Sequence, residues 1–168
     1  MTGSSTISEK EVSSLLQKCA FDKTARAVDI IHILQELHQS CTPIILCSDL
    51  LSSLNGSFEL TFSSAVFNLP FLGPISGGYM PNKEIITFDF QKENKMSLEV
   101  EILPFLPTIN INGDSLVLNQ TSNESPYLDY VVRGKEDRPP SQWKILYADE
   151  EIVAAKSSVT GFNVIKRV

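Results

Sequence analysis

Apolar residues recur at helical spacing along the N-terminal part of the chain. Ser8 and Glu11 fit a capping box, in which each side chain satisfies a free amide at a helix start. A second apolar stripe follows, and Pro43 ends it because proline cannot continue a helix. The spacing predicts two helices, or one broken helix, over residues 8–42, after a disordered N-terminus at 1–7. The second stripe contains Ala27, Ile30, Ile31, Ile33, Leu34 and Leu37.

From residue 54 onward, apolar and polar residues alternate, which is typical of half-buried strands. The polar residues 91–95 predict a hairpin connection, and Asn112-Gly113-Asp114 predicts a turn between two later strands. The alternating apolar positions are Phe58, Leu60, Phe62, Ile86, Phe88, Phe90, Leu98, Val100 and Ile102, and further strands are predicted at 108–111, 115–119, 128–132, 143–147, 152–156 and 162–166.

Short strands joined by turns, without intervening helices, predict an antiparallel barrel or sandwich. We therefore expect a mostly β protein in a single domain, with N-terminal helices and an antiparallel barrel or sandwich over residues 54–168. The interior of a barrel of about eight strands either fills with side chains or holds one small ligand. The pattern does not choose between these two.

The negative net charge of the chain argues against some classes of binding partner. The formal net charge of the 168 residues is −6, so phosphate backbones repel the chain and nucleic-acid binding is not expected. The same charge disfavours electrostatic docking on anionic lipid, so any association with lipid has to come from apolar contact. No stretch of the sequence approaches the roughly 18 apolar residues that a membrane helix needs.

The C-terminal residues 146–167 combine a short strand, an acidic corner, a strand ending in a cation, a tight turn and a closing strand. Earlier in the chain, residues 54–64 read Leu-Asn-Gly-Ser-Phe-Glu-Leu-Thr-Phe-Ser-Ser. Both segments resemble motifs of the plastid lipid-associated proteins, the fibrillin family of plants, algae and cyanobacteria. The positions that fall on the C-terminal motif are Tyr147, Asp149, Glu150, Glu151, Ile152 and Lys156.

The resemblance implies a lipocalin-like antiparallel β-barrel over residues 54–168. It further implies a non-catalytic protein that binds or carries small apolar molecules such as carotenoids, quinones or membrane lipids. It also implies a plastid location, in the chloroplast at the plastoglobule or the thylakoid, with peripheral contact to lipid droplets or the thylakoid membrane. No transit peptide or signal peptide is visible in the chain. No cofactor is expected, and the oligomeric state stays open.

The C-terminal motif departs from the family pattern at three positions, one of which is Ser157 in place of the family's Gly. Val153 stands where the family has its first Arg, and Lys156 stands where it has the second. If an ion pair closes the barrel, it has to join Asp149 to Lys156, and Lys lacks the planar two-pronged donor of Arg. We expect Asp149, Lys156 and Phe162 to have structural roles.

The apolar residues expected to face the barrel interior are the candidate ligand-binding residues. Tyr147 or Lys156, near the mouth, is expected to orient a head group. Two apolar segments with prolines, 67–72 and 103–107, either fold over a barrel end and cap the core, which we favour, or form the rim of a ligand entrance or a membrane-contacting lip. The candidate set is Phe58, Phe62, Phe88, Phe90, Val100, Ile102, Trp143 and Tyr147.

The other chemistry-bearing residues predict no catalytic or metal site. His32 and His38 are six positions apart and cannot share a helix face, whereas His32 and Glu36 are spaced for a surface contact. The three cysteines match neither a zinc motif nor a redox motif, so free thiols are expected, with a disulfide between the last two as the alternative. These cysteines are Cys19, Cys41 and Cys47.

Two rival functions belong to other classes. The first is a ligand-free interaction domain whose Phe/Pro loops dock a partner protein, which substitutions of Phe71 or Phe105 would test. The second is a barrel-shaped enzyme of the bilin-lyase type, which would need polar groups converging inside the cavity. Because the inward faces are predicted to be apolar, we rank the enzyme last.

Overall fold

The computed structural model describes residues 7–65, 67–69, 73–75 and 78–168, with the backbone alone for 67–69 and 73–75. As predicted, helices lead the chain: α1 (Glu9–Gln17) continues into a short π-helix, η1 (Lys18–Asp22), and α2 (Ala27–Ser40) follows. The capping box of Ser8 and Glu11 is present at the start of α1. The disorder expected at 1–7 lies outside the described residues, except for Ile7.

Within the described residues, eight antiparallel strands close into a barrel, which confirms the predicted lipocalin-like class. The strands follow one another around the barrel in the order β10-β11-β12-β2-β6-β7-β8-β9, and β9 pairs back with β10. In chain order, they are β2 (Gly56–Ser63), β6 (Lys83–Asp89), β7 (Lys95–Glu101), β8 (Ile109–Asn119), β9 (Tyr127–Val132), β10 (Ser141–Ala148), β11 (Ile152–Ser157) and β12 (Gly161–Arg167).

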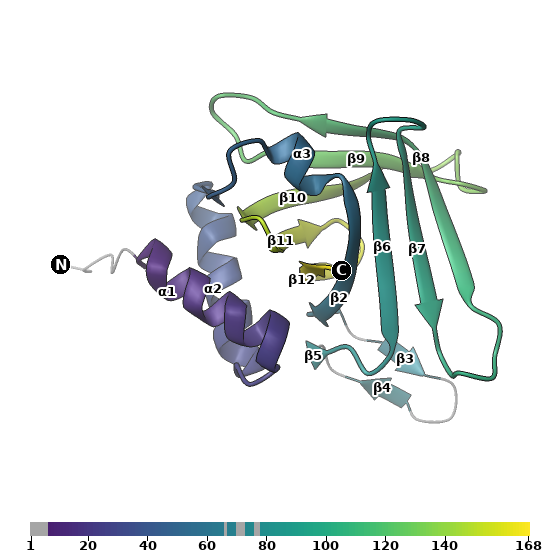
Figure 1. The fold of residues 1–168 in the computed structure, drawn as a ribbon, viewed down its shortest axis with the longest axis horizontal. Coiled ribbons are helices and arrows are strands. Elements are labelled where there is room, and N and C mark those ends of the chain that lie inside the picture. Colours follow the sequence, from purple (N-terminus) through teal and green to yellow (C-terminus); the bar gives the residue numbers. More distant parts are fainter. Residues whose placement is uncertain (1–6, 66, 70–72, 76–77) are drawn as a thin grey trace.

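Short elements complete the two ends of the barrel. The parallel strand β1 (Ile44–Ile45) pairs with the last part of β10, and β5 (Gly78–Tyr79) pairs with the last part of β2. The helix α3 (Leu50–Leu54) lies at one end of the barrel, and the hairpin of β3 (Phe67–Leu69) and β4 (Gly73–Ile75) lies at the opposite end (Figure 1).

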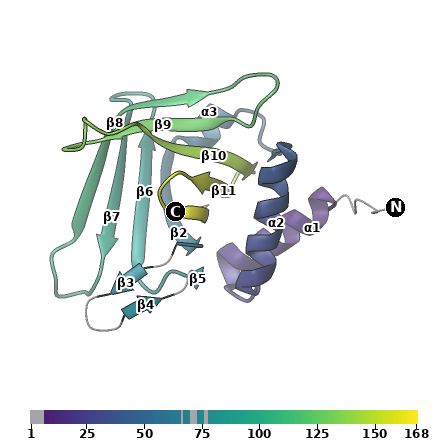
Figure 2. The ribbon, with the colours of Figure 1, turned by 180° about the vertical axis from the view of Figure 1, so that it is seen from behind.

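Two apolar layers share the strands of the barrel. One fills part of the interior and includes Leu54 and Ile145. The other lies outside the barrel, where α1 and α2 cover β10, β11 and β12, as Figures 1 and 2 show. The buried stripe of α2 is centred on Ile30, Leu34 and Leu37, while the other predicted positions are only partly buried. Because apolar layers cover both faces of β11, its residues 152–155 are all buried.

The turn predicted at Asn112-Gly113-Asp114 is wrong, because β8 runs through these residues without a break. A bulge between Asp114 and Val117 shifts the pairing of β8 with β9, and Ser115 there has a positive φ of 57°. Gly113 serves close packing rather than a turn: a Cβ atom at this position would lie 2.8 Å from the ring of Tyr130.

Candidate functional site

A cavity of about 590 Å³ occupies one end of the barrel interior. All eight barrel strands contribute to its wall, at the end where β7 finishes and β8 begins. Its mouth lies beside loop residues 135–140 and the turn at 157–160. The lining is mostly apolar and includes Leu60, Ile86, Met96, Leu98, Val100 and Trp143.

An aromatic layer fills the barrel beneath this cavity. The ring centroids of Phe58 and Phe88 are 6.1 Å apart, and those of Phe88 and Trp143 are 6.0 Å apart. Phe90 stacks on Phe88 toward the opposite end, at 6.4 Å, where Leu50 and Leu54 of α3 complete the core. The interior is therefore filled at the α3 end and open at the other, and Trp143 belongs to both parts.

The lining also carries a few polar groups. Glu84 precedes the inward-facing Ile86 by two residues on β6 and therefore faces the same side of the strand. Its carboxyl group lies in the cavity wall. Burial there raises the pKa of Glu84 above its usual range. Within the described residues, no cation pairs with this carboxyl group, although Lys135 and Arg138 lie at the mouth.

Among the candidate ligand-binding residues, only Val100 and Trp143 line the cavity. Phe58, Phe88 and Phe90 belong to the aromatic layer and do not reach it. The prediction that Ile102 faces the interior is wrong. It follows the last residue of β7, and 40% of its surface is exposed.

The inward orientation predicted for Phe62 and Tyr147 is also wrong, because a bulge precedes each residue. Val164 pairs with Phe62 and Ile165 with Leu60, which leaves Thr61 as an extra residue in β2. In β10, Leu146 is extra in the same way. An extra residue reverses the facing of the positions after it. Both aromatic side chains therefore pack outside the barrel, against the helices.

The C-terminal motif holds the barrel together, although not through the expected ion pair. Asp149 accepts hydrogen bonds from the Tyr147 hydroxyl and from the amides of Glu151 and Ile152, so it fixes the turn between β10 and β11. Asp149 and Lys156 stand at opposite ends of β11 and form no ion pair in the described structure. The ammonium group of Lys156 instead lies 4.6 Å from the ring centroid of Phe162.

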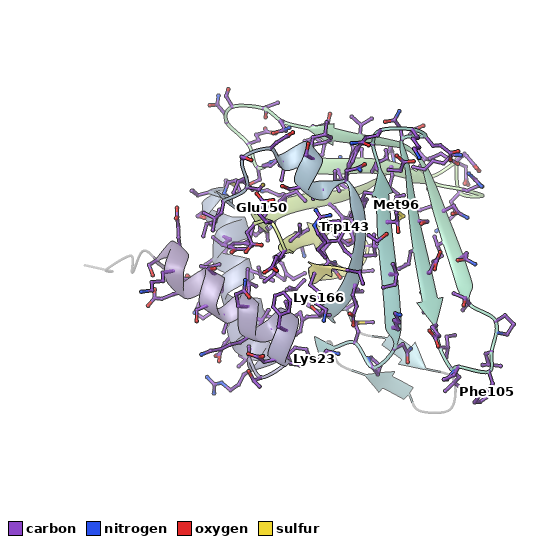
Figure 3. All side chains as sticks on the ribbon, viewed as in Figure 1. Lys23, Met96, Phe105, Trp143, Glu150 and Lys166 are labelled. Carbon is purple, nitrogen blue, oxygen red and sulfur yellow. The ribbon has the colours of Figure 1, made fainter. Side chains whose placement is uncertain are left out.

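The expectation that residues 103–107 cap the core is wrong, because their side chains are exposed. Phe105 is 80% exposed, and Figure 3 shows it on the loop between β7 and β8, at the end away from α3. The loop is therefore beside the cavity end but does not close it. The matching expectation for 67–72 lies outside the residues whose side chains are described.

Sequence reasoning missed Glu84, Leu98 and Tyr130 as lining residues. Glu84 and Leu98 carried a usable signal. Each has the parity of inward neighbours on its strand, so extending the alternation would have placed both inside. No such signal exists for loop residues 135–140, because their position depends on the pairing of β9 with β10.

The surface contact of His32 and the free thiols expected from the sequence are both present. His32 Nε2 lies 3.5 Å from the carboxylate of Glu36, as predicted for a surface contact. All three cysteines are free, which excludes the alternative Cys41–Cys47 disulfide in this structure. Among the described residues, no group of three or more His, Cys, Asp or Glu is placed to hold a metal ion.

In the described part of the chain, no helix has the length and apolar character needed to cross a membrane. Comparison with protein families, with curated proteins and with solved structures returned no significant match in any of the three.

Proposed function

We propose that this protein binds or carries a small apolar molecule, such as a carotenoid, a quinone or a membrane lipid, without catalysing a reaction. The observation that carries the proposal is the open apolar cavity of about 590 Å³ above the aromatic layer. Pockets for small ligands in proteins fall in the range of about 300–1,000 Å³ and are mostly apolar. The resemblance of residues 54–64 and 146–167 to the fibrillin family supports the same function, and with it a plastid location at the plastoglobule or thylakoid.

Apolar burial would supply the affinity. Each buried methylene contributes about 0.8 kcal/mol, so a long hydrocarbon chain needs no charged anchor. The chain would enter at the mouth beside residues 135–140 and end against Trp143. The carboxyl group of Glu84 would lie beside the bound apolar ligand, where its ionised form is unfavourable.

The test is binding of an apolar dye, together with organic extraction and mass spectrometry of protein from its native cells. Val100→Trp puts a large ring into the cavity and should weaken dye binding at least about tenfold, because dye and ring compete for the same space. Glu99→Trp is the matched control, since this neighbouring residue is exposed on the same strand. A protein that takes up no dye and yields no extractable ligand would overturn the proposal.

A second candidate function is a docking domain that holds a partner protein through its apolar loops. The exposure of Phe105 and of the neighbouring Leu103 and Leu106 favours it. In that case, Phe105→Ser should abolish capture of the partner, while Val100→Trp leaves capture unchanged. If instead Val100→Trp weakens dye binding and Phe105→Ser leaves it unchanged, the carrier function is supported.

A further inference from the structure

A second cavity, of about 560 Å³, lies on the outer face of the barrel. It is bounded by the end of α2, the segment before β9, the start of β10 and the end of β11. Figures 1 and 2 show α2 beside β10 and β11. We call this cavity the outer cleft; its walls include His38, Cys41, Ser125, Gln142, Lys144 and Lys156.

Two lysines face each other in the outer cleft. Lys144 and Lys156 are direct partners across β10 and β11, both half-buried and both on the outer face. Like charges at such a position repel each other and destabilise the sheet. Neither ammonium group forms an ion pair within the described structure. Residues 1–6 and 66–77 contain no Asp or Glu that could compensate them.

Two polar atoms in the same walls lack a partner. The Oγ atom of Ser125 is buried without a hydrogen bond, and only 2% of this residue is exposed. The Nδ1 atom of His38 is also buried without a partner in the described structure. Buried polar groups in native proteins are nearly always paired, so two such atoms beside a lysine pair mark the outer cleft as a candidate binding site.

The electrostatics of His38 agree with this arrangement. Burial, and then the charges of Lys144 and Lys156, lower the pKa of His38 below its usual range. Its ring also packs edge-on against Phe162, with the centroids 6.2 Å apart. The acidic residue in the cleft wall is Glu124, and it is exposed.

We propose that the outer cleft binds a small anion that carries a phosphate or carboxylate group, between Lys144 and Lys156. The two ammonium groups would compensate its charge, and the hydroxyl of Ser125 and the imidazole of His38 would hydrogen-bond its oxygens. A carboxylate or phosphate there removes the repulsion between the lysines and satisfies both unpartnered atoms. None of these four residues lines the barrel cavity.

The source of the anionic group is either a free ion or the head group of an amphiphile. Ser157 and Ser158 line both the outer cleft and the barrel cavity, so the two cavities are neighbours across this turn. An amphiphile whose chain passes over this turn would place its head group in the cleft and its chain in the barrel. Inorganic phosphate and dodecyl phosphate represent the two sources.

The experiment is titration of ¹⁵N-labelled protein with each probe at constant ionic strength, followed by NMR. We expect saturable shifts at Ser125, Lys144 and Lys156, with the Kd raised at least about tenfold in Lys144→Gln/Lys156→Gln. The control is Lys83→Gln/Lys92→Gln, which removes the same charge from exposed positions. Equal weakening in the control, or no saturable binding of either probe to the wild type, would overturn the proposal.

The two sources give different results. A free anion is indicated if both probes bind equally well and Val100→Trp changes neither. An amphiphile is indicated if dodecyl phosphate binds more tightly and Val100→Trp weakens this probe alone. If the carrier proposal is wrong and the outer-cleft proposal is right, the wild type should bind no dye but should still show the phosphate-induced shifts.

Thermal unfolding gives an independent check on the lysine pair. Without phosphate, Lys144→Gln should raise the Tm because it relieves the repulsion from Lys156 and keeps the contact of Lys156 with Phe162. With phosphate, the Tm of the wild type should rise and that of Lys144→Gln/Lys156→Gln should not. A double variant whose Tm rises as much as that of the wild type would contradict the site.

Discussion

The hydroxyl of Tyr147 donates a 2.6 Å hydrogen bond to Oδ2 of Asp149, whose Oδ1 accepts from two backbone amides of the β10–β11 turn. The tyrosine oxygen also lies 3.1 Å from Oγ of Ser13 in α1. This single phenol therefore joins the N-terminal helix to the barrel. Burial, and then the hydrogen bond to Asp149, raise its pKa to about 12.

Removing this hydroxyl should lower stability and change its pH dependence. We expect Tyr147→Phe to lower the free energy of unfolding by about 1–2 kcal/mol at pH 8, because Asp149 loses its donor. The folded-state pKa is raised above the ordinary value of 10.0, so the contribution of the phenol is complete below pH 10 and is lost as the pH rises toward about 12. Urea titrations across that window should show a shallower loss for the variant, whereas Tyr127→Phe should follow the wild type.

Arg167 should be sensitive to replacement by Lys. Its guanidinium group donates to the carbonyl oxygens of Ser53, Asn55 and Glu150, and it lies 4.7 Å from the ring centroid of Phe58. A lysine supplies a single ammonium group and cannot span these acceptors, so Arg167→Lys should cost about 1–3 kcal/mol in urea unfolding.

A matched substitution separates this effect from a general preference for Arg. Arg133 pairs with Asp114 on the surface, where the two side chains are 54% and 39% exposed. We expect Arg133→Lys to change the free energy of unfolding by less than about 1 kcal/mol. Equal losses in the two variants would show that the contacts of Arg167 have no special importance.

Glu84 should make binding of an apolar ligand depend on pH. Its pKa is raised by burial, and an apolar ligand in the cavity would disfavour the charged form further. The affinity for a neutral dye should therefore fall as the pH rises through the pKa of Glu84, and folding stability should fall in the same direction. Glu84→Gln should bind the dye more tightly at neutral pH and remove this dependence. Glu99→Gln, on the exposed side of β7, should keep the wild-type profile.

The thiols should differ sharply in reactivity. Cys41 is exposed, whereas Cys19 and Cys47 are buried, and burial raises the pKa of Cys19 to about 12. A thiol reagent should label one cysteine in the native protein and all three after unfolding. Peptide mass spectrometry should identify the native product as Cys41. Rapid native labelling at Cys19 would show that α1 and η1 open readily from the barrel.

The alternation of apolar residues predicted part of the barrel correctly. The inward-facing residues that it predicted correctly are Phe58, Leu60, Ile86, Phe88 and Leu98. On β6 and β7, the outer face is not covered by the helices, so alternation is visible and the facing can be read from it. The same parity would have placed Glu84 in the cavity wall.

The helix-covered strands gave no such signal. Both faces of these strands are buried, one by the barrel interior and the other by the helices. An apolar residue such as Phe62 or Tyr147 therefore suits either face. The bulges at Thr61 and Leu146 add one residue to one strand of a pair and leave no mark in hydrophobicity. Facing on these strands therefore cannot be read from apolar spacing.

The sequence by itself determined the N-terminal helices and the change from helices to short antiparallel strands, because these depend on local spacing and caps. The pairing of β12 with β2, which makes the sheet a closed barrel and not a sandwich, is a long-range contact. Only the tertiary structure decided which end of the barrel is filled and which is open. It also decided that Lys144 meets Lys156 beside Ser125. These features depend on strand pairing between residues distant in the chain, and on bulges that shift this pairing by one position.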